Sequence, residues 1–350
     1  MKLWFTKGLS NTAVAMSMIA NDPLSRDMAL LASHVDPLHP LRDVWQKFLV
    51  EPADAKGADY ADWVYMTARR EKIDLVIVQR QPRSLWPHRE RFAEAGIELL
   101  IPAMPEVLDI LDNKFSFQND LNVPDLSAAG VFGHAAIPFA NLAEFDAGRE
   151  RLLASGEAPY GLCVKPVVGI FGSGFRRIDD DGNEFERLMS TDPEDLYRIS
   201  LGGFRLALGR AEKPRPMILM PYLPGPERSV DFVAHQGELI AAVARRKVGK
   251  HQVLEVSGPA IDIVRKLARR YRLNGQCNLQ TREIDGRQIV LEINARMSGG
   301  MAMSCLAGVN LPLLAVLAAS GRVYPKPVYL TNRLHVAMVE KAQIINSDRL

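Results

Sequence analysis

The sequence has little of what marks secreted, membrane-spanning or nucleic-acid-binding proteins. It contains only three cysteines in 350 residues, Cys163, Cys277 and Cys305, at spacings typical of neither disulfide frameworks nor metal sites. The net charge of +2 gives no support for general attraction to nucleic acids or membranes. The longest apolar stretch, 301–319, is broken by glycine, asparagine and proline, so it does not read as a spanning helix. We expect a protein of the reducing cytosol with two or three domains.

Two common phosphate-binding motifs are also missing. No G-x-G-x-x-G follows a strand pattern near the N-terminus, which argues against a dinucleotide site. The glycine-rich run at 167–174 lacks the G-K-[ST] ending of a Walker loop. A nucleotide site in this chain must therefore be built from other residues.

Short apolar runs alternate with helical patterns in residues 1–112. Such alternation predicts a parallel sheet with crossover helices, so we expect a small α/β domain. Loops after its strands would face a ligand crevice, and the polar or glycine residues there are Gly8, Ser10, Asn11 and Arg80. The predicted strands are 3–6, 28–33, 75–78 and 97–101, and the predicted helices are 12–20, 60–71 and 89–95.

Residues 276–294 predict a β-hairpin around Asp285-Gly286. A two-residue loop would place Gln280 opposite Leu291, whereas a three-residue loop places it opposite Glu292. Only the second register separates a polar face from an apolar face that can be buried, so we predict the three-residue loop. The polar face would hold Asn278, Gln280, Glu292 and Asn294, and the apolar face Cys277, Leu279, Ile289, Leu291 and Ile293.

The polar face of this hairpin is rich in oxygen ligands. Gln280, Glu292 and Asn294 offer one carboxylate and two amide carbonyls, which suit Mg²⁺. Arg296, two residues further on, is placed to meet a phosphate oxygen with two parallel hydrogen bonds. The alternative is a solvated sheet face followed by an ordinary surface arginine.

A second candidate site begins at a strand that ends in Lys165. Gly169, Gly172 and Gly174 follow it, and glycines let backbone N–H groups approach a phosphate closely. Lys165 would add a mobile positive charge there. The alternative is an ordinary hairpin turn.

Together these motifs resemble those of ATP-grasp enzymes. The segment L-E-I-N-A-R at 291–296 resembles their E-x-N-x-R signature, and N-L-Q at 278–280 resembles the carbamoyl phosphate synthetase large subunit, where Gln replaces an acidic metal ligand. The resemblance runs from about Asp112 to Gly321. It implies an α/β (α+β) ATP-grasp fold: an N-terminal domain at 1–112, an ATP-grasp domain at 113–340 with a mobile lid at about 125–220, and a tail at 341–350.

The resemblance also implies roles for residues that match the family's positions. Lys114 and Lys165 would contact the nucleotide beneath the glycine loop. Pro221 and Leu223 would hold adenine through a C=O and an N–H, and Glu227 would bind the ribose hydroxyls; Met220 departs from the family's usual Glu. The basic stretch with Arg245, Arg246 and His251 matches the region that reaches the γ-phosphate and the acceptor. We predict Arg246, Lys165 and Arg296 as catalytic, although the sequence does not choose firmly among the three residues of that stretch.

The implied activity is ATP-dependent and Mg²⁺-dependent ligation. The γ-phosphate would activate a small carboxylate, or bicarbonate, as an acyl phosphate with release of ADP, and an amine would then attack. Alternatives are a carbamoyl-phosphate-synthetase-like bicarbonate or carbamate kinase, a ligase acting on a peptide tail, and a nucleotide-binding regulatory protein without turnover. A homodimer is compatible with each, and neither nucleic acid nor membrane is an expected partner.

Overall fold

The computed structural model describes residues 1–8, 11–45, 47–169, 172–180, 183–192, 194–330 and 333–339. Ser10 and the predicted tail at 341–350 lie outside these residues. The chain forms two compact units. The first contains Met1–Leu108, Arg228–Gln280 and Ile293–Leu350, and the second contains Asp109–Glu227 and Thr281–Glu292. The predicted division of the sequence at residue 112 stays a prediction.

The first unit begins with the parallel sheet that the alternating pattern predicted. Its order β3-β2-β1-β4-β5 is parallel throughout, which confirms the expected α/β class. Crossover helices connect the strands, as a parallel sheet requires. The strands are β1 (Lys2–Phe5), β2 (Ala29–His34), β3 (Phe48–Val50), β4 (Leu75–Ile77) and β5 (Glu98–Leu100), and the main helices are α1 (Thr12–Ala20), α3 (Gly57–Glu71) and α5 (Arg89–Glu94).

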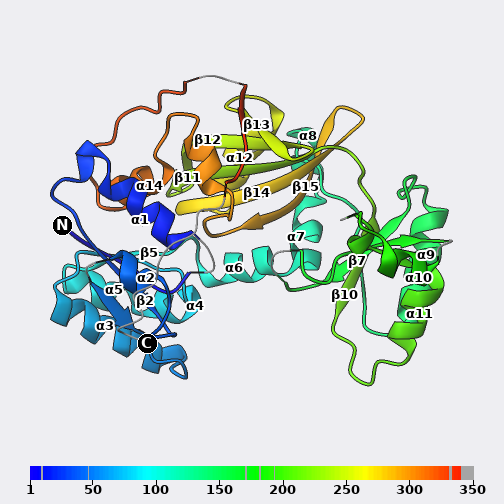
Figure 1. The fold of residues 1–350 in the computed structure, drawn as a ribbon, viewed down its shortest axis with the longest axis horizontal. Coiled ribbons are helices and arrows are strands. Elements are labelled where there is room, and N and C mark those ends of the chain that lie inside the picture. The colour runs from blue at the N-terminus through cyan, green and yellow to red at the C-terminus, as the bar shows by residue number, and fades with distance from the viewer. Residues whose placement is uncertain are drawn as a thin grey trace. The chain divides into compact units, whose positions relative to one another are not determined.

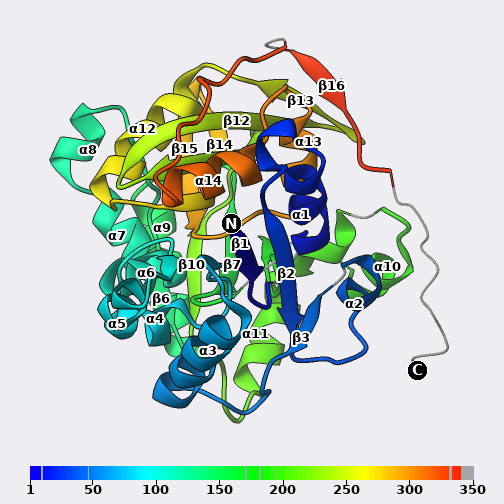
Figure 2. The same cartoon turned by 90° about the vertical axis from the view of Figure 1, so that its left-hand side faces the viewer.

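Side-chain alternation along β1 divides the core of the first unit into two layers. Leu3 and Phe5 pack with α1 and with α14 (Leu311–Ala319) against a second sheet, whereas Trp4 packs against α3 and α5 on the opposite face. Figure 2 shows α1 and α14 between the strands β1 and β2 and the strand β12 (Glu238–Val248). The N-terminal domain thus shares one apolar core with later parts of the chain.

The second sheet has the order β15-β14-β11-β12-β13-β16. Its pairings β11–β12, β12–β13 and β13–β16 are antiparallel. The helices α12 (Pro259–Arg270) and α13 (Met301–Cys305) belong, like this sheet's β11, β12, β13 and β16, to the first unit. The strands are β11 (Glu227–His235), β12, β13 (His251–Glu255), β14 (Gly275–Ile284), β15 (Arg287–Asn294) and β16 (Leu334–Val336).

The turn between β14 and β15 corrects the predicted register. It holds only Asp285 and Gly286, with φ of 49° and 77°, and both residues tolerate this left-handed region, which is what a two-residue turn needs. Gln288 Nε2 donates to Glu283 Oε2 (3.1 Å), as expected for strands joined in this way. The three-residue loop is therefore wrong. The predicted apolar face is wrong in part as well: Cys277, Leu279 and Ile293 are buried, but Val290 is buried where Ile289 and Leu291 are only half-buried.

The second unit is built on the sheet β6-β10-β7-β8-β9. Along β7, Leu162 and Val164 pack against α9 (Leu142–Ala154) and α11 (Leu201–Gly209), which lie beside β7 and β10 in Figure 1. Alternation therefore places Cys163 and Lys165 on the other face. The strands are β6 (Ile137–Phe139), β7 (Leu162–Pro166), β8 (Arg176–Asp179), β9 (Arg198–Ser200) and β10 (Met217–Pro221), and further helices are α6 (Pro105–Asp112), α7 (Lys114–Leu121), α8 (Pro124–Ala128) and α10 (Glu184–Met189).

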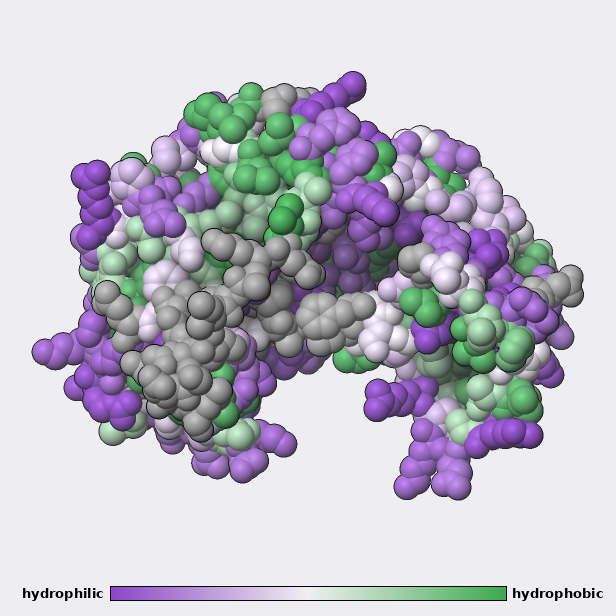
Figure 3. All heavy atoms as spheres, in the orientation of Figure 1, coloured by the Kyte–Doolittle hydropathy of each residue, from purple (hydrophilic) through white to green (hydrophobic). Residues whose placement is uncertain are grey.

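Helix α10 presents apolar side chains to solvent. Phe185, Leu188 and Met189 are 66–82% exposed, and Figure 3 shows a hydrophobic area over this helix. Among the described residues of the second unit, the buried apolar clusters include none of these three side chains. The helix is therefore held by its polar contacts, such as that of Glu184 Oε1 with the backbone N–H of Ser200 (2.5 Å).

Candidate functional site

Two lysines and one glutamate meet in the second unit. Lys114 is the first residue of α7, whose N-terminus is capped by Asn113 through a hydrogen bond from the Ser116 N–H (3.0 Å). Lys165 lies on β7. The ammonium groups of Lys114 and Lys165 are each 3.9 Å from Glu292 Oε2 on β15. The fold thus brings together residues that are widely separated in sequence.

Burial shapes the electrostatics of this cluster. Only 12% of the Lys165 side chain is exposed, and burial lowers its pKa below the usual lysine value; the Glu292 carboxylate opposes this shift and Lys114 adds to it. Two ammonium groups face a single carboxylate, so positive charge is in excess. Such an excess suits a polyphosphate.

The glycine loop is attached to the same cluster. The Lys114 backbone N–H donates to Val167 O (3.0 Å), and Lys114 Nζ donates to Gly169 O (2.9 Å). Gly172 and Gly174 have φ of 65° and 77°, and a Cβ at Gly174 would lie 2.8 Å from Pro166 Cγ. Glycine is therefore needed at 174 for backbone conformation and for space. Phosphate contact by Gly169, Gly172 and Gly174 stays a prediction.

The hinge predicted to hold adenine follows β10. Its sheet face is apolar, because Cys163, Ile218 and Met220 form a buried cluster with Tyr222 and Leu291 packed against it. Pro221 O lies 3.6 Å from Cys163 Sγ. An aromatic base would find an apolar surface beside this hinge, and hydrogen bonding of the base at Pro221 and Leu223 stays a prediction.

A cavity of about 710 Å³ borders the hinge within the second unit. It is lined by Pro221 to Leu223 together with residues of α7, β6 and α9, and by His134. His134 Nδ1 contacts Ala135 O at 2.8 Å, whereas its buried Nε2 has no hydrogen-bond partner within the described part of the chain. Burial, with Lys165 nearby, lowers the pKa of His134 to about 3. The cavity has the size of a small-molecule site.

Arg282 is a hinge residue that the sequence analysis missed. Its Nη1 donates to the carbonyls of Leu223 and Gly225 (both 3.1 Å), and its Nη2 lies 3.4 Å from Glu227 Oε2. A Cβ at Gly225 would lie 1.6 Å from Glu283 O, so the hinge passes against the β14 backbone. Arg282 orders the hinge and orients Glu227. The sequence could have pointed to Arg282, because it lies two residues after Gln280 and therefore on the same face of the strand β14.

The three residues of the basic stretch, Arg245, Arg246 and His251, differ in burial and in their contacts. Arg245 is buried and bonds five side chains, so it organises the interior of the first unit; they are Asp231, Ser304, Gln252, Ser229 and Ser298. Arg246 Nε donates to Glu255 Oε1 (2.8 Å), and the His251 ring lies 5.1 Å from the His335 ring. Arg80, singled out in the N-terminal domain, pairs with the buried Glu51 at 3.0 Å. A catalytic role for Arg246 stays a prediction.

Arg296 and Asn294 are adjacent in the first unit. Arg296 Nη2 donates to Asn294 Oδ1 and its Nη1 to Met297 O, both at 3.1 Å. Glu292 and Asn294 carry the oxygen donors that Mg²⁺ prefers, as does the amide of Gln280. The observed two-residue turn removes the register that was predicted to place Gln280 opposite Glu292. Clusters of three or more His, Cys, Asp or Glu suited to a metal are absent from the described residues. The magnesium site at Gln280, Glu292 and Asn294 stays a prediction.

Known proteins match the chain in sequence and in fold. The family described as "ATP-grasp in the biosynthetic pathway with Ter operon" matches residues 213–342. A curated relative, the carbamoyl phosphate synthase arginine-specific large chain of Bacillus subtilis, is 24% identical over 270 residues, which are 73% of this chain and 23% of the relative. The chain thus spans about a quarter of that relative's length.

Several solved structures share the fold. An N5-carboxyaminoimidazole ribonucleotide synthetase in complex with ADP matches with a TM-score of 0.62 and 14% identity over 94% of this chain and 79% of that one. The L-amino acid ligase of Bacillus licheniformis matches with a TM-score of 0.59 and 14% identity over 92% of this chain and 74% of the ligase. The biotin carboxylase domain of Hydrogenobacter thermophilus 2-oxoglutarate carboxylase was solved with MgADP and bicarbonate. It matches with a TM-score of 0.57 and 15% identity over 93% of this chain and 71% of that domain. No helix among the described residues is long and apolar enough to cross a membrane.

Proposed function

We propose that the chain, which matches an ATP-grasp family over residues 213–342, is an ATP-dependent, ADP-forming ligase that activates a carboxylate for attack by an amine. The observation that carries the proposal is the cluster of Lys114 and Lys165 around Glu292, with both N–O distances at 3.9 Å. Two buried cations beside a glycine loop suit the phosphates of a nucleotide. The apolar sheet face beside the hinge suits its base.

The residues of this chain would mainly bind and orient. Lys114 and Lys165 would neutralise the phosphates, and the bond of Lys114 to Gly169 ties the loop to the same cation. Glu292, Gln280 and Asn294 would hold Mg²⁺, which would supply positive charge to neutralise the phosphates. Arg296 would stabilise the charge that develops on the γ-phosphate. Arg282 would hold the hinge and Glu227 in position for the nucleoside.

The proposed reaction has two balanced steps. A carboxylate oxygen attacks the γ-phosphorus, the bond between that phosphorus and the oxygen bridging it to the β-phosphate breaks, and ADP leaves. The amine then adds to the carbonyl carbon of the acyl phosphate, inorganic phosphate departs, and the amine loses a proton to give an amide. Closure of the loop at 169–174 would keep water from the acyl phosphate.

Hydroxylamine trapping tests this function. The protein is incubated with MgATP, a panel of carboxylates and hydroxylamine, and both hydroxamate and ADP are measured. We expect equal amounts of the two products. Arg296→Ala should suppress trapping far more than it weakens ATP binding, because its proposed contact is to the reacting phosphate.

A matched control is Arg265→Ala, which removes an exposed arginine of α12 that pairs with the exposed Asp262 of the same helix. This variant should trap hydroxamate like the wild type. Release of AMP and pyrophosphate in place of ADP would identify an adenylation and overturn the acyl-phosphate mechanism. Nucleotide binding without any turnover across the panel would favour the regulatory alternative.

A second candidate is bicarbonate activation. The sequence match to a carbamoyl phosphate synthase large chain favours it. Bicarbonate belongs in the same panel, and ADP release with bicarbonate but with none of the organic acids would assign the chain to this activity.

A further inference from the structure

A second, smaller cavity lies entirely within the first unit, at the ends of three parallel strands. Phe5, Ile77 and Leu100, which line it, are the last residues of β1, β4 and β5. The chain runs outward from β1 through β2 to β3 on one side and through β4 to β5 on the other, so the strand order reverses between β1 and β4. Ligands of open parallel sheets bind at such a reversal, outside the carboxyl ends of the strands. We call this space the strand-end cavity.

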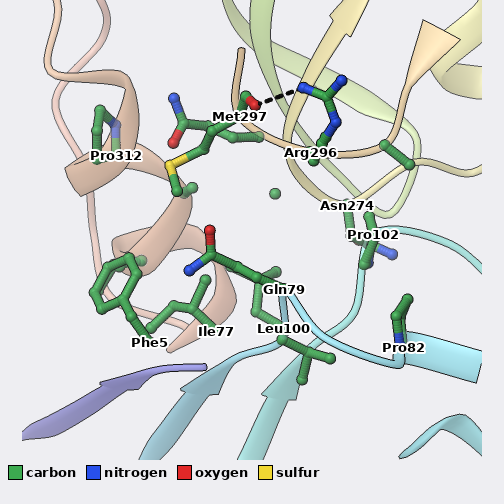
Figure 4. A pocket seen from close by; sticks show the side chains of 16 residues that line it. Phe5, Ile77, Gln79, Pro82, Leu100, Pro102, Asn274, Arg296, Met297 and Pro312 are labelled. Atoms are coloured by element: carbon green, nitrogen blue, oxygen red, sulfur yellow. Dashed lines mark hydrogen bonds between the residues drawn. The ribbon is translucent and has the colours of Figure 1, made fainter. Parts of the chain in front are cut away.

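The other walls of the strand-end cavity come from distant parts of the sequence. Ala315 and Val316 of α14 line it, together with Arg296 and Met297. Figure 4 shows Arg296 and Met297 across the cavity from Gln79 and from the strand ends. The residue that we propose contacts the reacting phosphate therefore also borders this cavity.

The lining is apolar at the strand ends and polar at few points. Gln79 is fixed in place, because its Nε2 donates to Thr6 O (2.9 Å) and to Thr12 Oγ1 (3.3 Å). A Cβ at Gly8 would lie 2.3 Å from Gln79 Oε1, so the glycine makes room for this side chain. The cavity therefore has a fixed wall of defined shape.

The volume limits what can enter. The cavity measures about 70 Å³. An engineered apolar cavity of about 150 Å³ accepts benzene, with six carbons, so this one has room for about three. A short aliphatic group fits both the size and the apolar lining, whereas an aromatic ring does not.

We infer that the strand-end cavity receives the aliphatic chain of the carboxylate substrate, and that this substrate is a short-chain aliphatic acid with about three carbons beyond the carboxylate. The inference rests on the proposed function, because it places the reacting carboxylate beside Arg296. An acid held there directs its chain toward the wall formed by Met297, Leu100 and Val316. The cavity then sets the preferred chain length.

The test is a series of straight-chain acids from acetate to hexanoate with MgATP and hydroxylamine. For the wild type, kcat/KM should rise about fourfold with each methylene up to butyrate and then stop rising, because each buried methylene strengthens binding by that factor. Ala315→Leu adds three carbons to the cavity wall. In this variant butyrate should be no better than acetate.

Two further variants test whether a changed chain-length profile in Ala315→Leu could come from misfolding. Ala318→Leu adds the same atoms to the same helix at an equally buried position that does not line the cavity, so it should keep the wild-type profile. Leu100→Ala enlarges the cavity and should move the optimum to pentanoate or hexanoate. Identical chain-length profiles in all four proteins would overturn this inference and leave the ligase function standing. ADP release with no carboxylate would overturn the proposed function itself, and the inference with it.

Discussion

Replacing Lys165 with methionine should weaken nucleotide binding without weakening the fold. Methionine has a similar length and no charge, so it removes the buried ammonium group and keeps the packing. The attraction between Lys165 and Glu292 at 3.9 Å is about 4 kcal/mol at an effective dielectric constant of about 20. Burial nevertheless lowers the pKa of Lys165, so the desolvation of the charge outweighs that attraction.

In the variant, the Glu292 carboxylate still has a positively charged partner, because the Lys114 ammonium group lies at the same distance from it. We expect a free energy of unfolding that is unchanged or higher by up to about 2 kcal/mol. A lysine whose pKa is lowered in the folded state binds fewer protons there than in the unfolded chain. Wild-type stability should therefore rise with pH between the folded pKa and about 10.4, and Lys165→Met should lack this rise.

Nucleotide affinity should move in the opposite direction. Loss of a charge-assisted contact to phosphate costs about 1.5–3 kcal/mol, or roughly 10- to 100-fold in the Kd for MgATP. Urea unfolding and titration calorimetry measure the two quantities, with Lys213→Met, at an exposed lysine of the same unit, as the control. Unchanged MgATP affinity would refute the placement of Lys165 at the phosphates. A loss of more than about 2 kcal/mol of stability would show that its ion pair holds the fold, against the reasoning from burial.

Three other predictions follow from the same geometry. Glu292→Gln should abolish Mg²⁺-dependent ADP formation while circular dichroism stays unchanged; wild-type turnover would remove Glu292 from the metal site. Asp231→Ala should lower the free energy of unfolding by about 3–5 kcal/mol, because Arg245 is then buried without its carboxylate partner at 3.0 Å, and a loss below about 1 kcal/mol in urea unfolding would contradict that reading. His134 has a folded pKa of about 3, so its contribution to stability is full above pH 6.5 and falls with pH toward 3. His134→Gln should therefore reduce the loss of stability between pH 6 and 4.5 by up to about 1.4 kcal/mol per pH unit, and an unchanged slope would show that His134 is not the titrating group.

Local patterns in the sequence predicted much of the fold. Period-two and helical alternation predicted four of the five strands of the parallel N-terminal sheet and the correct bounds of α1, because both depend on which faces of an element can be buried. The strand β3 was not predicted. The resemblance of L-E-I-N-A-R to the ATP-grasp signature is confirmed by the family match and the shared fold.

Other features depended on contacts between segments far apart in the chain. The sequence alone did not show that Arg245, which looks like its neighbour Arg246, is the buried one, because that depends on Asp231, Ser298 and Ser304 converging on it. The prediction of a three-residue loop around Asp285-Gly286 was wrong for the same reason. The polar and apolar faces were predicted from β14 and β15 alone. In the structure, Gln118 of α7 donates to the carbonyls of Val290 and Leu291, both at 3.0 Å, and so helps to decide which residues of β15 are buried. The sequence by itself determined the elements and the motif residues, because these follow from local spacing. Only the tertiary structure decided which charges are buried together and which walls close a cavity, since both require residues that the chain brings together only when it folds.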